Sequence, residues 1–466
     1  MKKFNLFIHR WSCIFFLISL VFVITSCMKE FLDIKRNKSQ VIPKTLEDYY
    51  SLLENQLITG FSVHQLSLLG SDEYYINSQQ WKSLVSPVFK NGYIWADEIF
   101  EGESSQDWNR GYEKILYANF ILEGVQDIVE SPANREFRNE IVGIAQFIRG
   151  YTLFNLAQIF CEQYDPQSAN LALGLPLRVT SNINNHYPRA TLQETYEQIL
   201  SDLETASLLL PDKMSLYTRP YRGSALAMLA NVYLQMGNFE QSLERANEAM
   251  NFAPKIVNYG EEVDTTLTYT FPLYGKGISE IMYFDQVGAP SPLLFTNINV
   301  DSVLYRGFGD NDIRKHAFFG INSGRIIFKG SYSGTPVGFF TGLTTPEVLL
   351  VSAECKARLG DSNGAIKDIR LLSENRYSID DQLVIGSSIT QKELIELVLS
   401  ERWKELAFRG RRWSDLKRFQ KDPALAKSIK RTLDGQDYVL AEQSAKWVWP
   451  IPPDVISLSG IIQNAR

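Results

Sequence analysis

Two stretches of the 466-residue chain combine aromatic rings with short polar side chains, a mixture suited to a ligand with apolar faces and polar edges, such as a sugar. One runs from 72 to 112 and the other lies within 255–344. Tyr and Trp rings stack on C–H faces, and Asp, Asn and Arg bond to hydroxyls. Burial in the core is the alternative for each ring, because large cores also consume Tyr and Phe. We predict exposed, ligand-contacting loop residues at Asp72, Tyr74, Tyr75, Asn77, Trp81, Trp95, Tyr283, Tyr305, Arg306 and Phe308.

A cysteine near the N-terminus is placed to carry a lipid. Three basic residues stand in 1–10, an uncharged apolar run follows at 11–24, and Thr25 and Ser26 precede Cys27. The run is too short to span a bilayer comfortably but suits the core of a signal peptide. The small residues let a peptidase approach the backbone, and the thiol is a nucleophile, so the pattern looks like a bacterial lipobox. We expect cleavage before Cys27 and anchoring by several acyl chains. An ordinary signal peptide with a chance cysteine is the alternative.

Signatures of catalysis and of metal binding are scarce. The histidines beyond the signal segment, His64, His186 and His316, lie far apart in the sequence. No Cys/His cluster, HExxH, P-loop or GxSxG motif occurs. Carboxylate pairs such as Asp72 and Glu73 are too common to indicate a glycosidase, although a glycosidase needs only two. We therefore expect no enzymatic activity, no cofactor and no metal ion.

Charge argues against nucleic acid as a partner. The formal net charge is −6, and a mildly acidic surface disfavours binding to phosphate backbones. The segment 399–431 is rich in Lys and Arg, but acids interleave with them and apolar residues recur at helical spacing. We interpret this segment as a solvated or packed structural helix in which Arg411, Arg412 and Asp415 make ion pairs and helix-end contacts.

Helical periodicity dominates the elements that must position these residues. Apolar residues recur at helical spacing over 109–129 and 139–160, and Thr191 before a Glu three residues later marks a helix start. Cys161 and Cys355 stand in apolar helical patterns, so we expect buried free thiols, with a disulfide between them as the alternative.

Two segments repeat a helix–turn–helix pattern. Residues 222–254 place Ala, Ser and Gly where two helices cross, at the spacing of a tetratricopeptide repeat, and 345–376 match at corresponding offsets. Between about 255 and 344, Gly, Ser, Asn, Thr and aromatic residues replace this periodicity. That composition predicts loops with short strands.

Four further stretches occur in a characteristic order. They read FLDIKRNKSQVIPKTLEDYYSLLEN at 31–55, IAQFIRGYTLFNLAQIFCEQY at 144–164 with GLPL at 174–177, LSERWKELAFRGRRWSDLKRF at 399–419, and VWPIPPDVISLSGIIQN at 448–464. Together they resemble the SusD/RagB family, the surface nutrient-binding lipoproteins of Bacteroidetes-type bacteria. The likeness covers nearly the whole chain.

The resemblance implies a mostly α fold, in which about four tetratricopeptide-like helical hairpins form a scaffold and a loop-rich, short-strand region packs on it. On this basis we divide the chain into a lipoprotein signal peptide and a single SusD-like domain. The predicted parts are the signal peptide at 1–26 and the domain at 27–466, with an N-terminal part at 27–220, the clearest repeats at 221–254 and 345–376, a ligand-side insertion at 255–344 and a C-terminal part at 377–466.

The implied function is capture of a nutrient, commonly an oligosaccharide, and its transfer to a SusC-like TonB-dependent outer-membrane barrel. The implied location is the outer membrane, at the cell surface, with the lipid as the sole membrane contact. Neither catalysis nor nucleic-acid binding is implied. Peptide uptake, a non-catalytic scaffold for protein contacts and a surface glycosidase stay open as alternatives. The family binds ligands through variable loops, so the resemblance assigns no ligand contact to any residue here.

Overall fold

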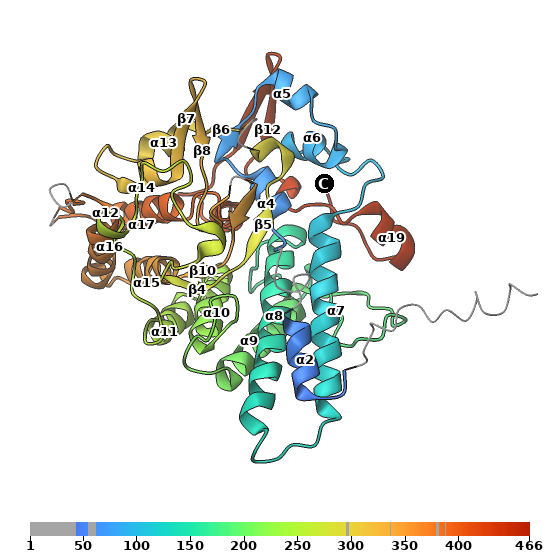
Figure 1. The fold of residues 1–466 in the computed structure, drawn as a ribbon. Coiled ribbons are helices and arrows are strands. Elements are labelled where there is room, and N and C mark those ends of the chain that lie inside the picture. The colour runs from blue at the N-terminus through green and yellow to red at the C-terminus, as the bar shows by residue number, and fades with distance from the viewer. Residues whose placement is uncertain (1–42, 55–61, 295–297, 336, 379–381, 387) are drawn as a thin grey trace, which may run out of the picture. The chain divides into compact units, whose positions relative to one another are not determined.

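The computed structural model describes residues 43–54, 62–294, 298–335, 337–378, 382–386 and 388–466. The chain divides into two compact units, Met1–Lys44 and Thr45–Arg466, and the described helices and strands belong to the second (Figure 1). Cys27 and the predicted signal peptide lie outside the described residues. Within the described ranges, no helix combines the length and apolar character needed to cross a membrane.

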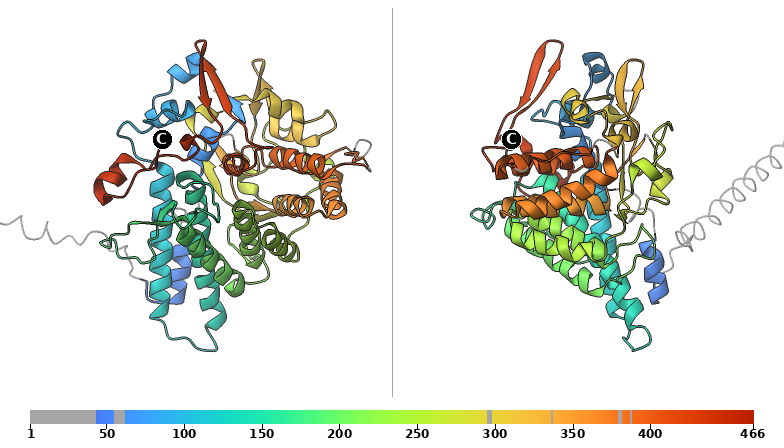
Figure 2. Two further views of the ribbon diagram at one scale, coloured as in Figure 1. Left: turned by 180° about the vertical axis from the view of Figure 1, so that it is seen from behind. Right: turned by 90° about the vertical axis from the view of Figure 1, so that its left-hand side faces the viewer.

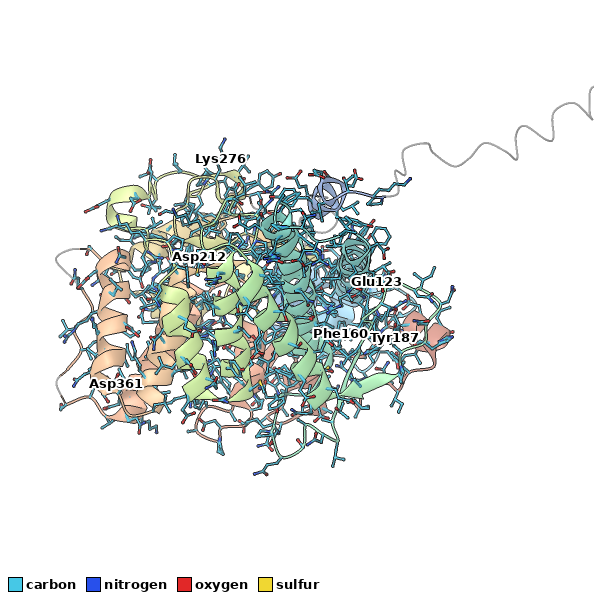
Figure 3. All side chains as sticks on the ribbon, turned by 90° about the horizontal axis from the view of Figure 1, so that it is seen from below. Glu123, Phe160, Tyr187, Asp212, Lys276 and Asp361 are labelled. Carbon is cyan, nitrogen blue, oxygen red and sulfur yellow. The ribbon has the colours of Figure 1, made fainter. Side chains whose placement is uncertain are left out.

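Long helices packed side by side make up the scaffold, as Figure 3 shows from below. Each of α7 to α10 contacts the next helix along the chain, α11 contacts α15, and α15 also packs on α16 and α17. The bounds are α7 (Gln106–Gln126), α8 (Arg135–Phe160), α9 (Leu192–Leu209), α10 (Arg222–Met236), α11 (Phe239–Met250), α15 (Thr345–Arg358), α16 (Ser362–Arg376), α17 (Gln391–Glu405) and α18 (Arg412–Phe419). The helices predicted at 109–129, 139–160, 222–254 and 345–376 are all present.

Local sequence sets the ends and the crossings of these helices. The Thr191 side chain accepts a hydrogen bond from the Glu194 N–H, and the Glu194 side chain accepts one from the Thr191 N–H, so a capping box starts α9 as predicted. Gly237, with φ of 75°, ends α10. Where α10 and α11 cross, Ser242 Oγ donates to the Ala230 carbonyl at 2.8 Å, and small side chains allow this close approach.

Short helices and strand pairs fill the remainder, and in 255–344 they match the predicted texture. The sheet structure of the described chain consists of antiparallel pairs. These are β1 (Tyr74–Tyr75) with β6 (Asn299–Val300), β2 (Leu173–Pro176) with β3 (Arg189–Thr191), β4 (Ile281–Tyr283) with β10 (Leu343–Thr344), β5 (Gln286–Gly288) with β9 (Gly338–Phe340), β7 (Phe319–Asn322) with β8 (Arg325–Phe328) and β11 (Ile429–Leu433) with β12 (Gln436–Leu440). The short helices are α2 (Leu46–Leu53), α4 (Gln65–Gly70), α5 (Ser78–Lys82), α6 (Pro87–Tyr93), α12 (Tyr259–Glu262), α13 (Ser302–Gly307), α14 (Ile313–Phe318) and α19 (Pro453–Ser459), with 3-10 turns at η1 (Leu273–Gly275), η2 (Ser291–Leu293) and η4 (Ala445–Trp447).

A buried set of charges joins the 255–344 segment to α16 and α17. Arg376 Nη2 donates to both Glu280 oxygens, at 2.8 and 2.9 Å, and to Glu405 Oε1 at 2.9 Å. Arg314 bonds to Asp312 at 2.8 Å and to Glu405 at 3.1 Å. Burial lowers the pKa of Arg376, but Glu280 and Glu405 outweigh it and raise that pKa well above its ordinary value. We call these five residues the ion network.

The basic segment near the C-terminus is structural, as predicted. Arg411 pairs with Glu347 at 2.9 Å, Arg412 pairs with Asp72 at 2.7 Å, and Asp415 accepts from Arg418 at 2.8 Å. The residues of these three pairs are largely buried.

The two cysteines of the described chain are free and buried, as expected. Burial raises the pKa of the Cys161 thiol to about 11 and that of the Cys355 thiol to about 12. At neutral pH both therefore stay protonated, and neither is a reactive thiolate.

Candidate functional site

The two aromatic stretches predicted from the sequence meet at the β1–β6 strand pair. Tyr75 lies opposite Asn299. The Asn299 amide Nδ2 donates to the Tyr75 carbonyl at 3.3 Å and lies 3.5 Å from Gln80 Oε1 on α5. Because the pair is antiparallel, α5, which follows β1, lies next to Asn299, whereas α13, which follows β6, leaves the pair at the other end, where the Asp301 N–H donates to the Glu73 carbonyl at 2.8 Å. We define the β1–β6 face by the side chains of Tyr75, Asn77, Gln80, Trp81, Asn299, Tyr305 and Arg306.

Two hairpins stand beside this strand pair. β8 contacts β6, and Arg325 Nη1 donates to the Ile298 carbonyl at 3.4 Å. On the other side, Asp434 in the β11–β12 turn pairs with Lys82 of α5 at 2.6 Å, and its N–H donates to Ser78 Oγ at 2.8 Å. Both hairpins project on the same side of the helical scaffold in every view (Figures 1 and 2).

Three of the predicted rings keep exposed surface on this face. Tyr75 is 50% exposed, and Trp81 and Tyr305 are partly exposed. The Trp81 indole N–H donates to the Lys90 carbonyl at 2.8 Å, and the Tyr305 ring packs edge-on against Phe319 at 5.6 Å. Trp81 and Tyr305 are therefore already held in place, so ordering them costs a ligand little entropy.

Two of the predicted polar residues are exposed on the same face. Asn77 caps α5, its side chain accepting from the Gln80 N–H at 2.9 Å. Arg306 lies on α13, with Nη2 at 3.4 Å from Ser302 Oγ. Amide and guanidinium groups next to rings supply the hydrogen bonds that a sugar hydroxyl needs.

The predicted exposure is wrong for the other four rings, because Tyr74, Trp95, Tyr283 and Phe308 are all core residues. Successive strand residues point to opposite faces, so Tyr74 faces inward where Tyr75 faces outward. Tyr283 packs edge-on against the Phe147 ring at 4.9 Å. Phe308 and Phe319 meet edge-on at 5.2 Å, and Trp95 Nε1 donates to the Gly70 carbonyl at 3.3 Å. Rings covered in this way cannot stack on a ligand.

Asp72 is an ion-pair partner rather than a ligand contact. Its carboxylate accepts from Arg412 Nε and Nη2 at 2.7 and 2.9 Å and pairs with Lys427 at 2.6 Å. Burial alone raises the pKa of the Asp72 carboxyl, but Arg412 and Lys427 bring it far below its ordinary value. The expectation that Asp72 is free to bond a ligand is therefore wrong, because Arg412 and Lys427 already occupy its oxygens.

Arg431, which the sequence analysis did not single out, holds the underside of the face together. Its Nη2 donates to the Leu69 and Ser71 carbonyls at 3.0 and 2.7 Å, and its Nη1 donates to the Tyr93 carbonyl. Its guanidinium lies 4.0 Å from the Tyr93 ring centre and 4.3 Å from that of Trp95. In the sequence Arg431 is part of a basic run. Its partners lie far away in the sequence, so no local pattern distinguishes it from the other basic residues of that run.

A buried serine–histidine contact occurs but is not arranged for hydrolysis. Ser62 Oγ lies 2.7 Å from His64 Nδ1, and Arg411 Nη1 lies 3.2 Å from His64 Nε2. Arginine only donates, so Nε2 must accept, which places the ring proton on Nδ1, facing Ser62. That tautomer cannot take the serine proton. Burial and then Arg411 also lower the pKa of His64 well below its ordinary value.

Within the described ranges, no group of three or more His, Cys, Asp or Glu side chains is placed to hold a metal ion. At 310–312, Asp312 accepts from the Arg314 N–H and side chain. Its oxygens are therefore committed to the ion network.

Two family models match the chain. The model described as "Starch-binding associating with outer membrane" matches residues 30–234, and the SusD family model matches residues 345–465. The chain therefore belongs to the SusD/RagB family, as the sequence motifs indicated.

One relative is similar in sequence, and solved structures share the fold. SusD-like protein P2 of Formosa agariphila is 22% identical over 386 residues, 71% of this chain and 74% of that protein. A putative sugar binding protein from Bacteroides vulgatus superposes with a TM-score of 0.72 at 20% identity, covering 91% of this chain and 99% of that one. A SusD superfamily protein from Bacteroides thetaiotaomicron superposes with a TM-score of 0.70 at 18% identity, covering 90% of this chain and 98% of that one. The predicted mostly α, SusD-like fold is thus confirmed.

Proposed function

We propose that this protein binds oligosaccharides on the β1–β6 face and delivers them to a TonB-dependent outer-membrane transporter, with no bond made or broken. One observation carries the proposal. The strand pairing joins segments 224 residues apart at exposed Tyr75, with partly exposed Trp81 on the helix that follows β1 and partly exposed Tyr305 and exposed Arg306 on the helix that follows β6. The starch-binding description of the family model and the sugar-binding name of a structural neighbour support a saccharide as the ligand.

Capture follows from the arrangement of the face. A sugar ring that lies on Tyr75 or Tyr305 buries its C–H face against an aromatic surface. The exposed Asn77 amide and the exposed Arg306 guanidinium would bond its hydroxyls. Because these side chains come from separate elements, a chain of several sugar units can contact more than one of them at once. Release needs only dissociation, which suits transfer to a partner.

The anchor and the partner complete the proposal. A lipid on Cys27 would tether the domain to the outer membrane and raise its local concentration at a transporter. The Cys27→Ser variant should lose incorporation of a radiolabelled fatty acid and move from the membrane to the soluble fraction. Co-purification of the tagged lipoprotein with a large outer-membrane barrel would support delivery. Its absence in mild detergent would refute delivery without touching ligand binding.

Calorimetry tests the ligand and the face together. The mature chain is titrated with hits from a glycan array screened beside a peptide pool. Tyr75→Ala and Tyr305→Ala should each weaken binding by about 1–2 kcal/mol, or roughly 5- to 30-fold. The matched control is Tyr269→Ala, a comparably exposed tyrosine (44%) outside the face. Equal affinities for all three variants would refute the β1–β6 face as the binding surface.

The screen also separates the alternatives. Binding of peptides alone would keep an uptake role and change the ligand class. A protein that binds no small ligand but retains a protein partner would be a scaffold. Release of reducing ends from a bound glycan would show a glycosidase.

A further inference from the structure

A second concave surface lies between α7, the segment 176–187 and α19. It is a cleft of about 640 Å³, a volume typical of small-molecule sites. Its lining includes the rings of Trp108, Tyr112 and Tyr187 and the amides of Asn109, Asn184 and Asn185. In Figure 3, Tyr187 lies in the loop next to α19, beyond the end of α8 marked by Phe160. None of these residues belongs to the β1–β6 face.

The rings of the cleft are fixed by contacts within the protein. Trp108 packs against Tyr112 with ring centres 4.8 Å apart and against Phe160 at 5.0 Å. The Tyr112 hydroxyl donates to the Pro176 carbonyl at 3.0 Å. The Tyr187 hydroxyl lies 2.7 Å from Thr180 Oγ1 and accepts from the Asn185 amide at 3.2 Å. A ligand therefore meets a formed aromatic surface edged by amides.

An arginine in the lining has an unsatisfied donor. The Arg178 guanidinium carbon lies 5.7 Å from the centre of the Tyr187 ring. The Arg178 side chain is partly exposed in the lining, and its Nη2 has no hydrogen-bond partner among the described residues. A guanidinium without an acceptor in a concave site is open to one that a ligand brings. A carboxylate is the acceptor that forms the strongest bonds with a guanidinium.

We propose that this cleft binds an acidic saccharide, with the sugar ring against the Tyr187 and Tyr112 surface and a uronic acid carboxylate on Arg178. The amides of Asn109, Asn184 and Asn185 would bond the hydroxyls. Asp454 on α19 also lines the cleft, and its carboxylate repels an acid, which favours the Arg178 side of the lining. The proposal rests on the proposed function only in taking the ligand to be a saccharide.

The test compares acidic tetrasaccharides with their methyl esters, which share ring and linkage but lack the charge. The probes are galacturonate, glucuronate, mannuronate and guluronate tetramers, titrated into the mature chain. For the best of them we expect the wild type to bind the acid at least about tenfold more tightly than the ester. Arg178→Gln should abolish that preference. Tyr187→Ala should weaken acid and ester alike, because it removes ring stacking.

The control variant is Arg370→Gln, which removes an exposed arginine of α16 outside the cleft and the β1–β6 face and should leave the preference for the acid unchanged. No side-chain hydrogen bond of Arg178 is described, so its glutamine variant should keep the wild-type unfolding midpoint. An acid preference that survives in Arg178→Gln, or no binding of any acidic probe, overturns the inference. If Tyr75→Ala alone reduces binding, the proposed function stands and the cleft proposal fails. If only the Arg178 and Tyr187 variants change binding, the cleft proposal stands and the β1–β6 face fails.

Discussion

Replacing Arg431 with methionine should both destabilise the protein and loosen the proposed binding face. Arg431 is 5% exposed, and its guanidinium donates to three buried carbonyls, two of which, at Leu69 and Ser71, lie just before β1. Methionine fills much of the volume but supplies no donor. Hydrogen bonds to charged groups contribute about 1.5–3 kcal/mol each and are not additive, so a loss of about 3–5 kcal/mol is expected. Urea unfolding followed by tryptophan fluorescence measures it.

The same substitution should weaken saccharide binding although Arg431 contacts no ligand. With Ser71 released, β1 loses part of what fixes Tyr75 opposite Asn299. A fall in affinity of about tenfold corresponds to about 1.4 kcal/mol and is measurable by calorimetry.

A neighbour on the same strand provides the control. Lys430 is exposed and pairs with exposed Asp437 at 2.8 Å. Lys430→Met should therefore change the free energy of unfolding by less than about 1 kcal/mol. If Arg431→Met unfolds at the same urea concentration as Lys430→Met, the buried arginine does not hold this region. If Arg431→Met lowers the free energy of unfolding but leaves the saccharide affinity unchanged, ligand binding at the face does not depend on the position of β1.

Three further outcomes are expected. Arg376→Met leaves the buried Glu280 without its arginine and Glu405 with Arg314, and it should cost about 3–5 kcal/mol, measured by urea unfolding. A smaller loss than that of an exposed arginine variant would contradict the network's role. Burial raises the pKa of Glu73 to about 8, so the neutral carboxyl is favoured in the folded state. The stability that this proton contributes is present below the unfolded pKa of about 4.3 and is lost as the pH rises toward 8. Glu73→Gln should therefore flatten the decline of the urea midpoint between pH 5 and 8, and an unchanged slope would contradict this assignment. A thiol reagent at pH 8 should modify Cys161 and Cys355 only after urea unfolding, and rapid labelling of the folded chain would show that they are accessible.

The helical scaffold could be predicted because its determinants are local. The Thr191 cap and the glycine that ends α10 act within a single turn of helix, and apolar periodicity needs only a window of the sequence. The same holds for the segment 399–431, where interleaved charges indicated ion pairs before their partners were known.

The candidate site could be predicted only in part, because its assembly is not local. β1 is two residues long, so its alternation does not stand out in the sequence, and Tyr74 and Tyr75 looked equivalent. The pairing partner of Tyr75 lies 224 residues away, and the cation that supports it lies in a hairpin near the C-terminus. Composition located both aromatic stretches, but exposure of each ring depends on those distant contacts.

The ion network limits how the 255–344 segment can be exchanged between relatives. Glu280, Asp312 and Arg314 come from that segment, whereas Arg376 and Glu405 come from the helices beyond it. A transplanted segment must therefore bring matching charges at the three inner positions, or it leaves buried ions uncompensated. The exposed tip of the β7–β8 hairpin carries no such requirement, with Ile321 77% exposed. Ligand specificity can therefore be redesigned at such hairpin tips one loop at a time, whereas the buried charges of the ion network must be exchanged together.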